Sequence, residues 1–235
     1  MRTRHERPNL TRLTRLGFVN AYLVREPDGF TLVDTMLRGS AGGILAAAAA
    51  AGQPIRRIVL THAHSDHAGS LDAVAARLPG AEIAISEREA RLLAGDHGLE
   101  PNEPPLRLRG GWPNVTTTPT RLLADGDRVG SLRVVAAPGH TPGHIALMDE
   151  RDGTLIAGDA YSTLAGVFTT GRTNPRFPLP AMATWNRPMT NRTAAALRAL
   201  GPAALAVGHG PVIAEPGAAM DRALRAVGQA PAVAV

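Results

Sequence analysis

Three histidines and one aspartate occur within six residues, directly after a short apolar run at positions 58–60. Pro54 and polar residues bound this run, which predicts a buried strand that ends at the first histidine. In an extended segment, residues two apart project to the same side, so the first three of these side chains can converge. The four residues are His62, His64, Asp66 and His67.

Imidazole and carboxylate groups at this density predict a metal centre. One ion is not expected to take all four groups. We expect two imidazoles to bind one ion, and a carboxylate and an imidazole to bind a neighbouring ion. Other segments of the chain must complete the ligands of each ion. The alternative is a histidine-rich polar loop, a pattern that this composition produces by chance roughly once in a few thousand chains.

Three further candidate ligands each follow an apolar run and are preceded by glycine. They are His140, Asp159 and His209. Glycine weakens a strand but allows backbone to crowd a site, so its repetition at three predicted strand ends is hard to explain by packing alone. We therefore expect these residues to supply the ligands that the first cluster lacks.

The motifs T-H-A-H-S-D-H at 61–67, H-T-P-G-H at 140–144, A-G-D at 157–159 and G-H-G-P at 208–211 resemble those of the metallo-β-lactamase superfamily across nearly the whole chain. The resemblance implies an α/β fold, a four-layer αβ/βα sandwich of two mixed sheets flanked by helices, with a dinuclear metal site between the sheets. Carried over by position, one ion is held by His62, His64 and His140, the other by Asp66, His67 and His209, and Asp159 bridges both.

The bridging aspartate is similar to that of glyoxalase II and the acyl-homoserine lactonases, whereas the true β-lactamases lack it and are exported. The resemblance thus implies a metal-dependent hydrolase of a small ester, thioester or lactone, in which Asp66 orients a hydroxide and passes its proton to the leaving group. β-Lactam hydrolysis is one alternative. A metal-dependent phosphodiesterase, nuclease or nucleic-acid-binding protein, suggested by the basic composition, is another.

Two ions about 3.5–4 Å apart lower the pKa of a shared water, so that hydroxide forms at neutral pH. Zinc is the expected metal because the ligands are nitrogen and oxygen, and iron, manganese or cobalt fit the same set.

Three other residues, Asp34, His144 and Tyr161, each have a structural and a functional interpretation. Asp34 either accepts a hydrogen bond from a metal-binding histidine or caps a strand end. His144 is expected to have a structural role rather than to bind metal. Tyr161, two residues after Asp159, is a candidate catalytic residue whose hydroxyl would reach a substrate oxygen, although buried tyrosines commonly only hydrogen-bond. The remaining histidines, His5 and His97, are expected at the surface.

Two irregular stretches, 96–120 and 160–185, are expected to be long loops that overhang the site. The second contains residues that could form an apolar wall with a cationic group for an acidic substrate. These are Phe168, Arg172, Arg176, Phe177 and Trp185.

The elements between the motifs follow from apolar runs and turn residues. A hairpin is expected at 17–24 and 30–33, and Ser86 with Glu89 has capping-box spacing for a helix ending near residue 94. The end, 229–235, is expected to be frayed. The other expected strands are 82–85, 132–136, 144–148, 154–157 and 203–207, and the other helices are 41–51, 70–78, 192–200 and 216–227.

The composition fits one α/β domain over residues 1–235. All 25 basic residues are arginine, for a net charge of +5, but they are dispersed and aromatic residues are only 3%, so we expect no nucleic-acid partner. The absence of cysteine fits a reducing compartment, and neither a secretory signal nor a membrane span is evident. A small-molecule substrate and a cytoplasmic location are expected. Oligomeric state is left open, with a homodimer among the options.

Overall fold

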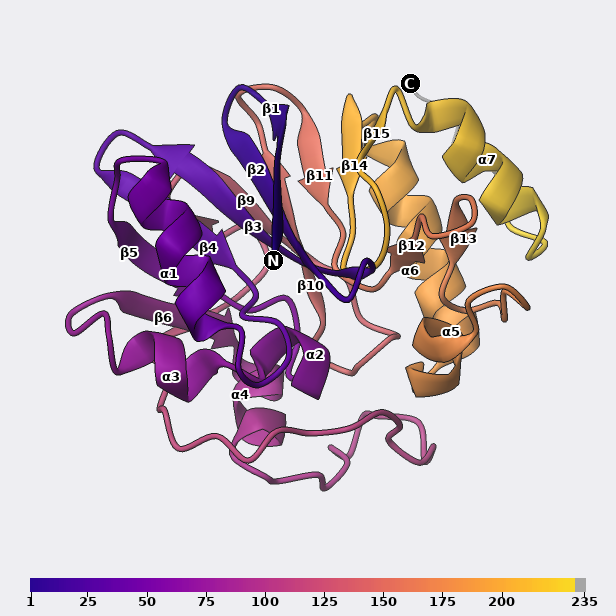
Figure 1. Ribbon diagram of the computed structural model, residues 1–235. Helices are drawn as coiled ribbons and strands as arrows, with labels where there is room; N and C mark the ends of the chain where they lie inside the picture. Colours follow the sequence, from indigo (N-terminus) through magenta and orange to yellow (C-terminus); the bar gives the residue numbers. More distant parts are fainter. Residues whose placement is uncertain (231–235) are drawn as a thin grey trace.

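Two β-sheets pack face to face, and helices cover the outer face of each (Figure 1). The computed structural model describes residues 1–230. Its four layers confirm the expected α/β sandwich. None of the helices in this range has the length and apolar content needed to cross a membrane.

The first sheet contains seven strands in sequence order. The first four pair antiparallel, and the remaining three extend the sheet as parallel neighbours. These strands are β1 (Arg2–Arg7), β2 (Leu10–Arg15), β3 (Val19–Glu26), β4 (Gly29–Val33), β5 (Ile55–Val59), β6 (Glu82–Ser86) and β7 (Arg121–Leu123).

The second sheet has six strands in the order β15, β14, β11, β10, β9, β8, and only β11 and β14 pair in parallel. A separate two-stranded ribbon lies beside it. The strands are β8 (Arg128–Val129), β9 (Leu132–Ala136), β10 (Ile145–Asp149), β11 (Thr154–Ile156), β14 (Ala204–Ala206) and β15 (Ile213–Ala214), and the ribbon comprises β12 (Tyr161–Ser162) and β13 (Phe168–Thr169).

The helices divide between the two outer faces. Side chains of α1, α3 and α4 share a buried cluster with the first sheet, and those of α6 and α7 share one with the second. The helices are α1 (Ala41–Ala50), α2 (Ser65–Ala68), α3 (Leu71–Ala75), α4 (Glu87–Leu93), α5 (Leu179–Ala183), α6 (Arg187–Ala199) and α7 (Gly217–Arg225).

Side chains alternate in direction along the central strands, so one face of the sheet packs on helices and the other on the second sheet. On β3, Ala21 and Leu23 face the helices while Tyr22 and Val24 face the second sheet. Successive side chains of a strand point to opposite faces, so a strand buried on both faces reads as a continuous apolar run. This is why the central strands were predictable from the sequence.

The ends of four strands meet at one edge of the sandwich. Strands β9 and β11 both pair antiparallel with β10, so they run in the same direction, and β14 runs parallel to β11. A hydrogen bond from the Ile145 amide to the Thr61 carbonyl, 3.0 Å long, joins the end of β5 to the second sheet. The segments that follow β5, β9, β11 and β14 therefore lie together.

The structure differs from the expected elements in several places. Elements that were not predicted are β1, β2, β7, β8, β15, the β12–β13 ribbon, α2 and α5. Helix α6 begins at Arg187, five residues earlier than expected, because the Asn186 side chain accepts a hydrogen bond from the Met189 amide and caps it. Ser70 does not cap α3; its hydroxyl donates to the Leu37 carbonyl. The expected frayed end falls mainly on residues 231–235, which lie outside the described residues.

Candidate metal centre

All seven residues assigned by the motifs come together at the edge where the strand ends meet. Within three overlapping groups, the possible ligand atoms lie within 4.8 Å of one another. The first group follows β5 and β9, the second adds Asp159 after β11, and the third adds the residue after β14. The groups are His62, His64 and His140; His62, His67 and Asp159; and Asp66, His67 and His209.

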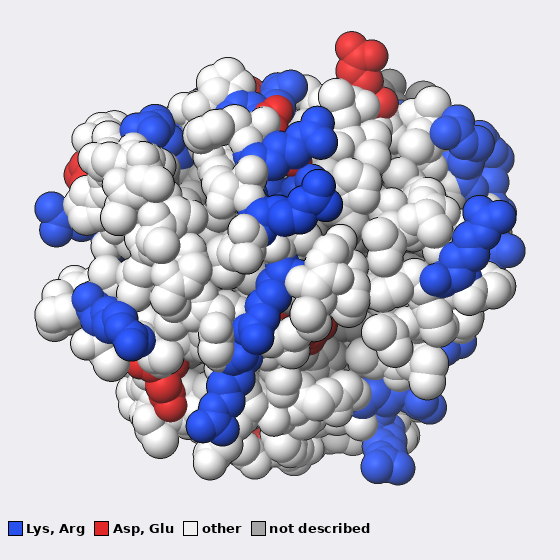
Figure 2. All heavy atoms as spheres, in the orientation of Figure 1, with Lys and Arg blue, Asp and Glu red and all other residues white. Residues whose placement is uncertain are grey.

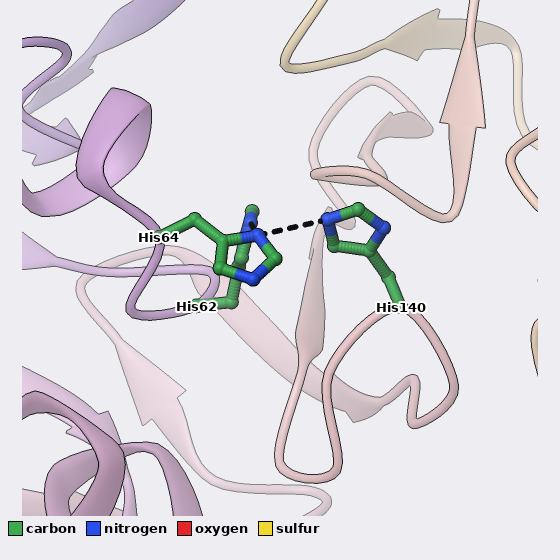
Figure 3. A group of neighbouring side chains, drawn as sticks. All are labelled: His62, His64 and His140. Atoms are coloured by element: carbon green, nitrogen blue, oxygen red, sulfur yellow. Dashed lines mark hydrogen bonds between the residues drawn. The ribbon is translucent and has the colours of Figure 1, made fainter. Parts of the chain in front are cut away.

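Three imidazoles converge around the Nδ1 atom of His64 (Figure 3). This atom lies 3.1 Å from Nε2 of His62 and 3.1 Å from Nε2 of His140. All three residues are buried. Two come from the β5–α2 loop and one from the β9–β10 loop, so the group spans both sheets.

The outward-facing nitrogen of each of these imidazoles is committed to a protein acceptor. His64 Nε2 donates to the Arg109 carbonyl at 2.9 Å. His140 Nδ1 donates to the Thr184 hydroxyl at 3.0 Å, because that hydroxyl gives its own hydrogen to backbone carbonyls. His62 Nδ1 donates to the Thr61 hydroxyl at 3.1 Å, and that hydroxyl donates to a carboxylate. The three inward-facing nitrogens of the neutral rings therefore all carry lone pairs.

A second group faces the first across a carboxylate. His67 Nδ1 donates to Asp34 at 2.8 Å, and His209 Nδ1 donates to the Phe18 carbonyl at 3.2 Å. The Nε2 atom of His209 faces inward and lies 3.3 Å from Oδ2 of Asp66, whose side chain is 34% exposed. In all five imidazoles, one nitrogen is held by the protein and the other points into the site.

Asp159 lies between the two groups. Its carboxylate oxygens are 3.5 Å from Nε2 of His67, 3.5 Å from Nε2 of His140 and 3.2 Å from Nε2 of His209. Asp159 is buried, and among residues 1–230 neither its Oδ1 atom nor Nε2 of His67 has a hydrogen-bond partner. One carboxylate thus contacts imidazoles of both groups, which is the arrangement expected of a bridging residue.

The two groups have opposite electrostatics. Burial lowers the pKa of His62, His64 and His140, so these rings are neutral at pH 7. Burial would also lower the pKa of His67 and His209, but the charges and hydrogen bonds of two carboxylates together outweigh it, Asp159 with Asp34 at His67 and Asp159 with Asp66 at His209. They raise the pKa of His67 well above its ordinary value and that of His209 to about 9. Burial opposes ionisation of Asp159, yet the neighbouring histidines hold its pKa well below the usual range.

This donor set fits divalent metal ions. Three lone pairs directed at one another, with no hydrogen between them, repel unless a cation lies among them. Ligand atoms about 2.0–2.1 Å from a tetrahedral ion lie about 3.3 Å apart, close to the 3.1–3.5 Å separations found here. Outer hydrogen bonds that fix the free nitrogen of each imidazole are typical of metal-binding histidines.

Apolar rings surround the site. Phe18 and Phe177 pack edge to face at 5.3 Å and both lie against His209, while Trp112 packs against His64 at 4.7 Å. The expected wall is therefore present at Phe177. Phe18 and Trp112 were not identified from the sequence.

The rest of the second irregular stretch is placed as follows. Trp185 is buried and donates from its indole to the Leu106 carbonyl at 3.0 Å, so it ties the two irregular stretches together. Phe168 is half-buried on β13, and Arg172 and Arg176 are exposed.

The remaining residues with two interpretations are resolved by their contacts. Asp34 accepts from His67 and from the Thr61 amide at 2.8 Å, which supports its orienting role. His144 belongs to none of the ligand groups; its Nε2 accepts from the Asp159 amide at 2.9 Å, as expected of a structural residue. His5 and His97 are exposed.

Tyr161 is not where its proximity to Asp159 suggested. Its side chain is fully buried among the apolar residues between the second sheet and α6, and its hydroxyl donates to the Ala194 carbonyl at 2.8 Å. The turn after Asp159 directs this ring toward α6. The expected substrate contact is therefore corrected: the hydroxyl is already committed to a helix backbone.

In Tyr161→Phe, we expect kcat/KM to stay within about twofold of the unsubstituted protein and the free energy of unfolding to fall by about 1–3 kcal/mol. The reason is that the Ala194 carbonyl loses a buried donor. Urea unfolding and steady-state kinetics test the two parts separately. A tenfold loss of kcat at unchanged stability would restore the catalytic assignment.

Comparison with known proteins agrees with this geometry. A family model described as the metallo-beta-lactamase superfamily matches residues 14–209. The uncharacterized protein YobT of Bacillus subtilis (strain 168) is 44% identical over 217 residues, which cover 92% of this chain and 93% of YobT. The hydroxyacylglutathione hydrolase of Aeromonas salmonicida (strain A449) is 32% identical, covering 63% of this chain and 50% of that enzyme. The acyl-coenzyme A thioesterase MBLAC2 of Gallus gallus is 35% identical, covering 51% and 46%.

Solved structures share the fold. The DIM-1 metallo-β-lactamase superposes with a TM-score of 0.70 over 95% of this chain and 94% of its own, at 15% identity. The protein TTHA1623, in a di-iron-bound form, superposes with a TM-score of 0.61 over 88% of this chain and 94% of its own, at 26% identity.

Proposed function

Because this chain belongs to the metallo-β-lactamase superfamily, we propose that it is a dinuclear metallohydrolase that cleaves a small ester, thioester or lactone. The observation that carries the proposal is a set of five imidazoles around one buried carboxylate, each with one nitrogen held by the protein and the other directed into the site. The partly similar hydroxyacylglutathione hydrolase and acyl-coenzyme A thioesterase support this choice of bond.

We assign one ion to His62, His64 and His140 and the other to Asp66, His67 and His209, with Asp159 between them. When bound, divalent ions at these positions would supply a water of lowered pKa and polarise a carbonyl oxygen. Zinc suits the nitrogen and oxygen ligands, and iron remains a candidate because TTHA1623 is a di-iron form.

The protein's own groups orient the reaction. The Asp66 carboxylate is the most exposed of the proposed ligands, at 34%, so it can reach both a water and a departing group. We assign it the role of orienting the water and transferring its proton. Phe18, Phe177 and Trp112 limit the access of bulk water around this point. No covalent intermediate with the protein is required.

A panel of substrates tests the proposal. Metal-loaded protein is assayed with glutathione and coenzyme A thioesters, lactones, a chromogenic cephalosporin and an aryl phosphodiester. We expect thioesters or lactones to be the best substrates, with activity abolished by chelation. A preference for the cephalosporin or the phosphodiester would replace the proposed bond type, and inactivity toward all compounds would contradict the proposal.

The surface charge favours an anionic substrate. Figure 2 shows arginine side chains along one side of a hollow near the centre of one face, with acidic atoms visible inside the hollow. Arg176 is exposed and precedes Phe177, which packs on His209 at 5.5 Å. We propose that a carboxylate or phosphate of the substrate lies near such a cation.

Replacing Arg176 with alanine is expected to raise KM for an anionic substrate by up to about fivefold and to leave KM for a neutral one unchanged. An exposed charge contributes at most about 1 kcal/mol, which sets this limit. Arg225→Ala, on α7, is the control. If Arg176→Ala changed KM equally for the anionic and the neutral substrate, the Arg176 charge would not account for substrate binding.

A further inference from the structure

Glu89 is a fully buried carboxylate that belongs to none of the three ligand groups found in the described residues. It lies on α4, and its two oxygens accept from the Ala63 amide at 2.8 Å and from the Gly143 amide at 2.9 Å. Ala63 lies between His62 and His64, and Gly143 lies three residues after His140. One carboxylate therefore ties together the two loops that carry the three-histidine group.

The sequence suggested a different use for this residue. Its spacing from Ser86 predicted a capping box, and the Ser86 hydroxyl does accept from the Glu89 amide at 3.3 Å. The Glu89 carboxylate, however, points to the ligand loops instead of returning to the helix end. A helix cap would not require burial of a carboxylate, so its position has another cause.

Asn20 makes the corresponding contacts with the other group. It is buried on β3, and its amide group donates to the Val207 carbonyl at 2.9 Å and to the Gly210 carbonyl at 2.7 Å. Its backbone amide donates to the Gly208 carbonyl at 2.9 Å. Asn20 thus fixes both ends of the loop that carries His209.

We propose that Glu89 and Asn20 are positioning residues that separately hold the two metal positions, Glu89 the three-histidine position and Asn20 the position that includes His209. Within the described residues, the hydrogen bonds of the Glu89 carboxylate go to the loops around His62 and His140, and Asn20, among the ligand-carrying loops, hydrogen-bonds to the 207–210 loop alone. Each substitution should therefore weaken one position and spare the other.

Two near-isosteric variants isolate the effects. Glu89→Gln replaces an accepting oxygen with an NH2 group that faces a backbone N–H, and Asn20→Asp replaces a donor with an oxygen that faces two carbonyls. Glu87→Gln, exposed on the same helix, and Thr14→Val, which removes only the hydroxyl that donates to Asn20 Oδ1, are the matched controls. Should either primary variant not fold, Glu89→Ala or Asn20→Ala replaces it, with the same expectation.

The experiment is a zinc titration of metal-free protein, followed by the imidazole nitrogen NMR signals, which report which histidines bind metal. We expect Glu89→Gln to weaken zinc binding about 10–100-fold at His62, His64 and His140 only, and Asn20→Asp to do so at His67 and His209 only. Thr61→Val should weaken both positions, because the Thr61 hydroxyl contacts His62 and lies 3.5 Å from His67.

Equal weakening of both positions, no weakening, or the reverse pattern would overturn the proposal. It rests on the proposed metal centre and not on the bond that is cleaved. If the variants show no selective weakening of zinc binding while thioester or lactone hydrolysis persists, only this inference is lost. If selective weakening is found but every substrate in the panel is inert, only the proposed bond type is lost.

Discussion

In Asp159→Asn, we expect kcat/KM to fall by at least about a hundredfold and the metal content to fall below two ions per chain. Asp159 is buried and its carboxylate lies within 3.5 Å of imidazole nitrogens from both groups. Asparagine keeps the shape but removes the charge, and a metal supplies several kcal/mol of transition-state stabilisation, each 1.36 kcal/mol being about tenfold in rate. Elemental analysis and steady-state kinetics measure the two effects.

The matched control is Asp28→Asn, an exposed carboxylate that pairs with Arg57 at the surface. It should retain full metal content and activity, because an exposed ion pair contributes little. If Asp159→Asn binds two ions and turns over at the rate of the unsubstituted protein, the carboxylate does not link the two positions, and the dinuclear assignment fails.

The ligand candidates were predictable because their signal is local. His62, His64 and His67 follow an apolar strand within a few residues, and each of the remaining three, His140, Asp159 and His209, follows another strand just as closely. Chain direction in a sheet then determines where those ends lie, since strands that run the same way place their carboxyl ends at the same edge. The superfamily resemblance supplied the pairing between segments, which spacing alone does not give.

Apart from Asp34, the groups that fix the imidazoles were not predicted, because several of them are not side chains. The Arg109 and Phe18 carbonyls accept hydrogen bonds that orient His64 and His209, and every residue has a carbonyl. Thr184 and Trp112 lie in irregular segments far along the chain. Their role depends on how those segments cross the site, and no periodic pattern records that path.

Two of the errors have clear physical causes. Tyr161 was assigned by its distance along the chain, but the turn after Asp159 directs the ring toward α6, where Ala194 accepts its hydrogen bond. Strand β1 was missed because it is an edge strand, largely exposed and rich in arginine, with no alternation of apolar residues. Charged edge strands resist unwanted pairing but give no strand signal in the sequence.

Removing the metals by chelation is expected to lower the melting temperature, and this decrease in melting temperature should become larger as the pH rises. A bound metal stabilises the folded state by about 4 kcal/mol at a thousandfold excess over its Kd. In metal-free protein at pH 7, protons on His67 and His209 partly replace the cations, because both pKa values are raised. Metal binding at this pH should therefore release protons from this group and none from the neutral three-histidine group.

The sign of the pH dependence follows from His209. Its pKa is about 9 in the folded protein and about 6.5 when unfolded, so the stabilisation from its proton is complete below pH 6.5 and is lost as the pH rises through 9. This difference is worth on the order of 3 kcal/mol.

The metal-loaded protein becomes more stable over the same pH range, because deprotonated imidazoles bind metal more tightly. The melting-temperature gap between loaded and chelated protein should therefore widen from pH 6 to pH 9, and His5→Ala, at the surface, should not alter it. A gap that stays constant would mean that His209 does not exchange a proton for a metal, and would remove it from the second position.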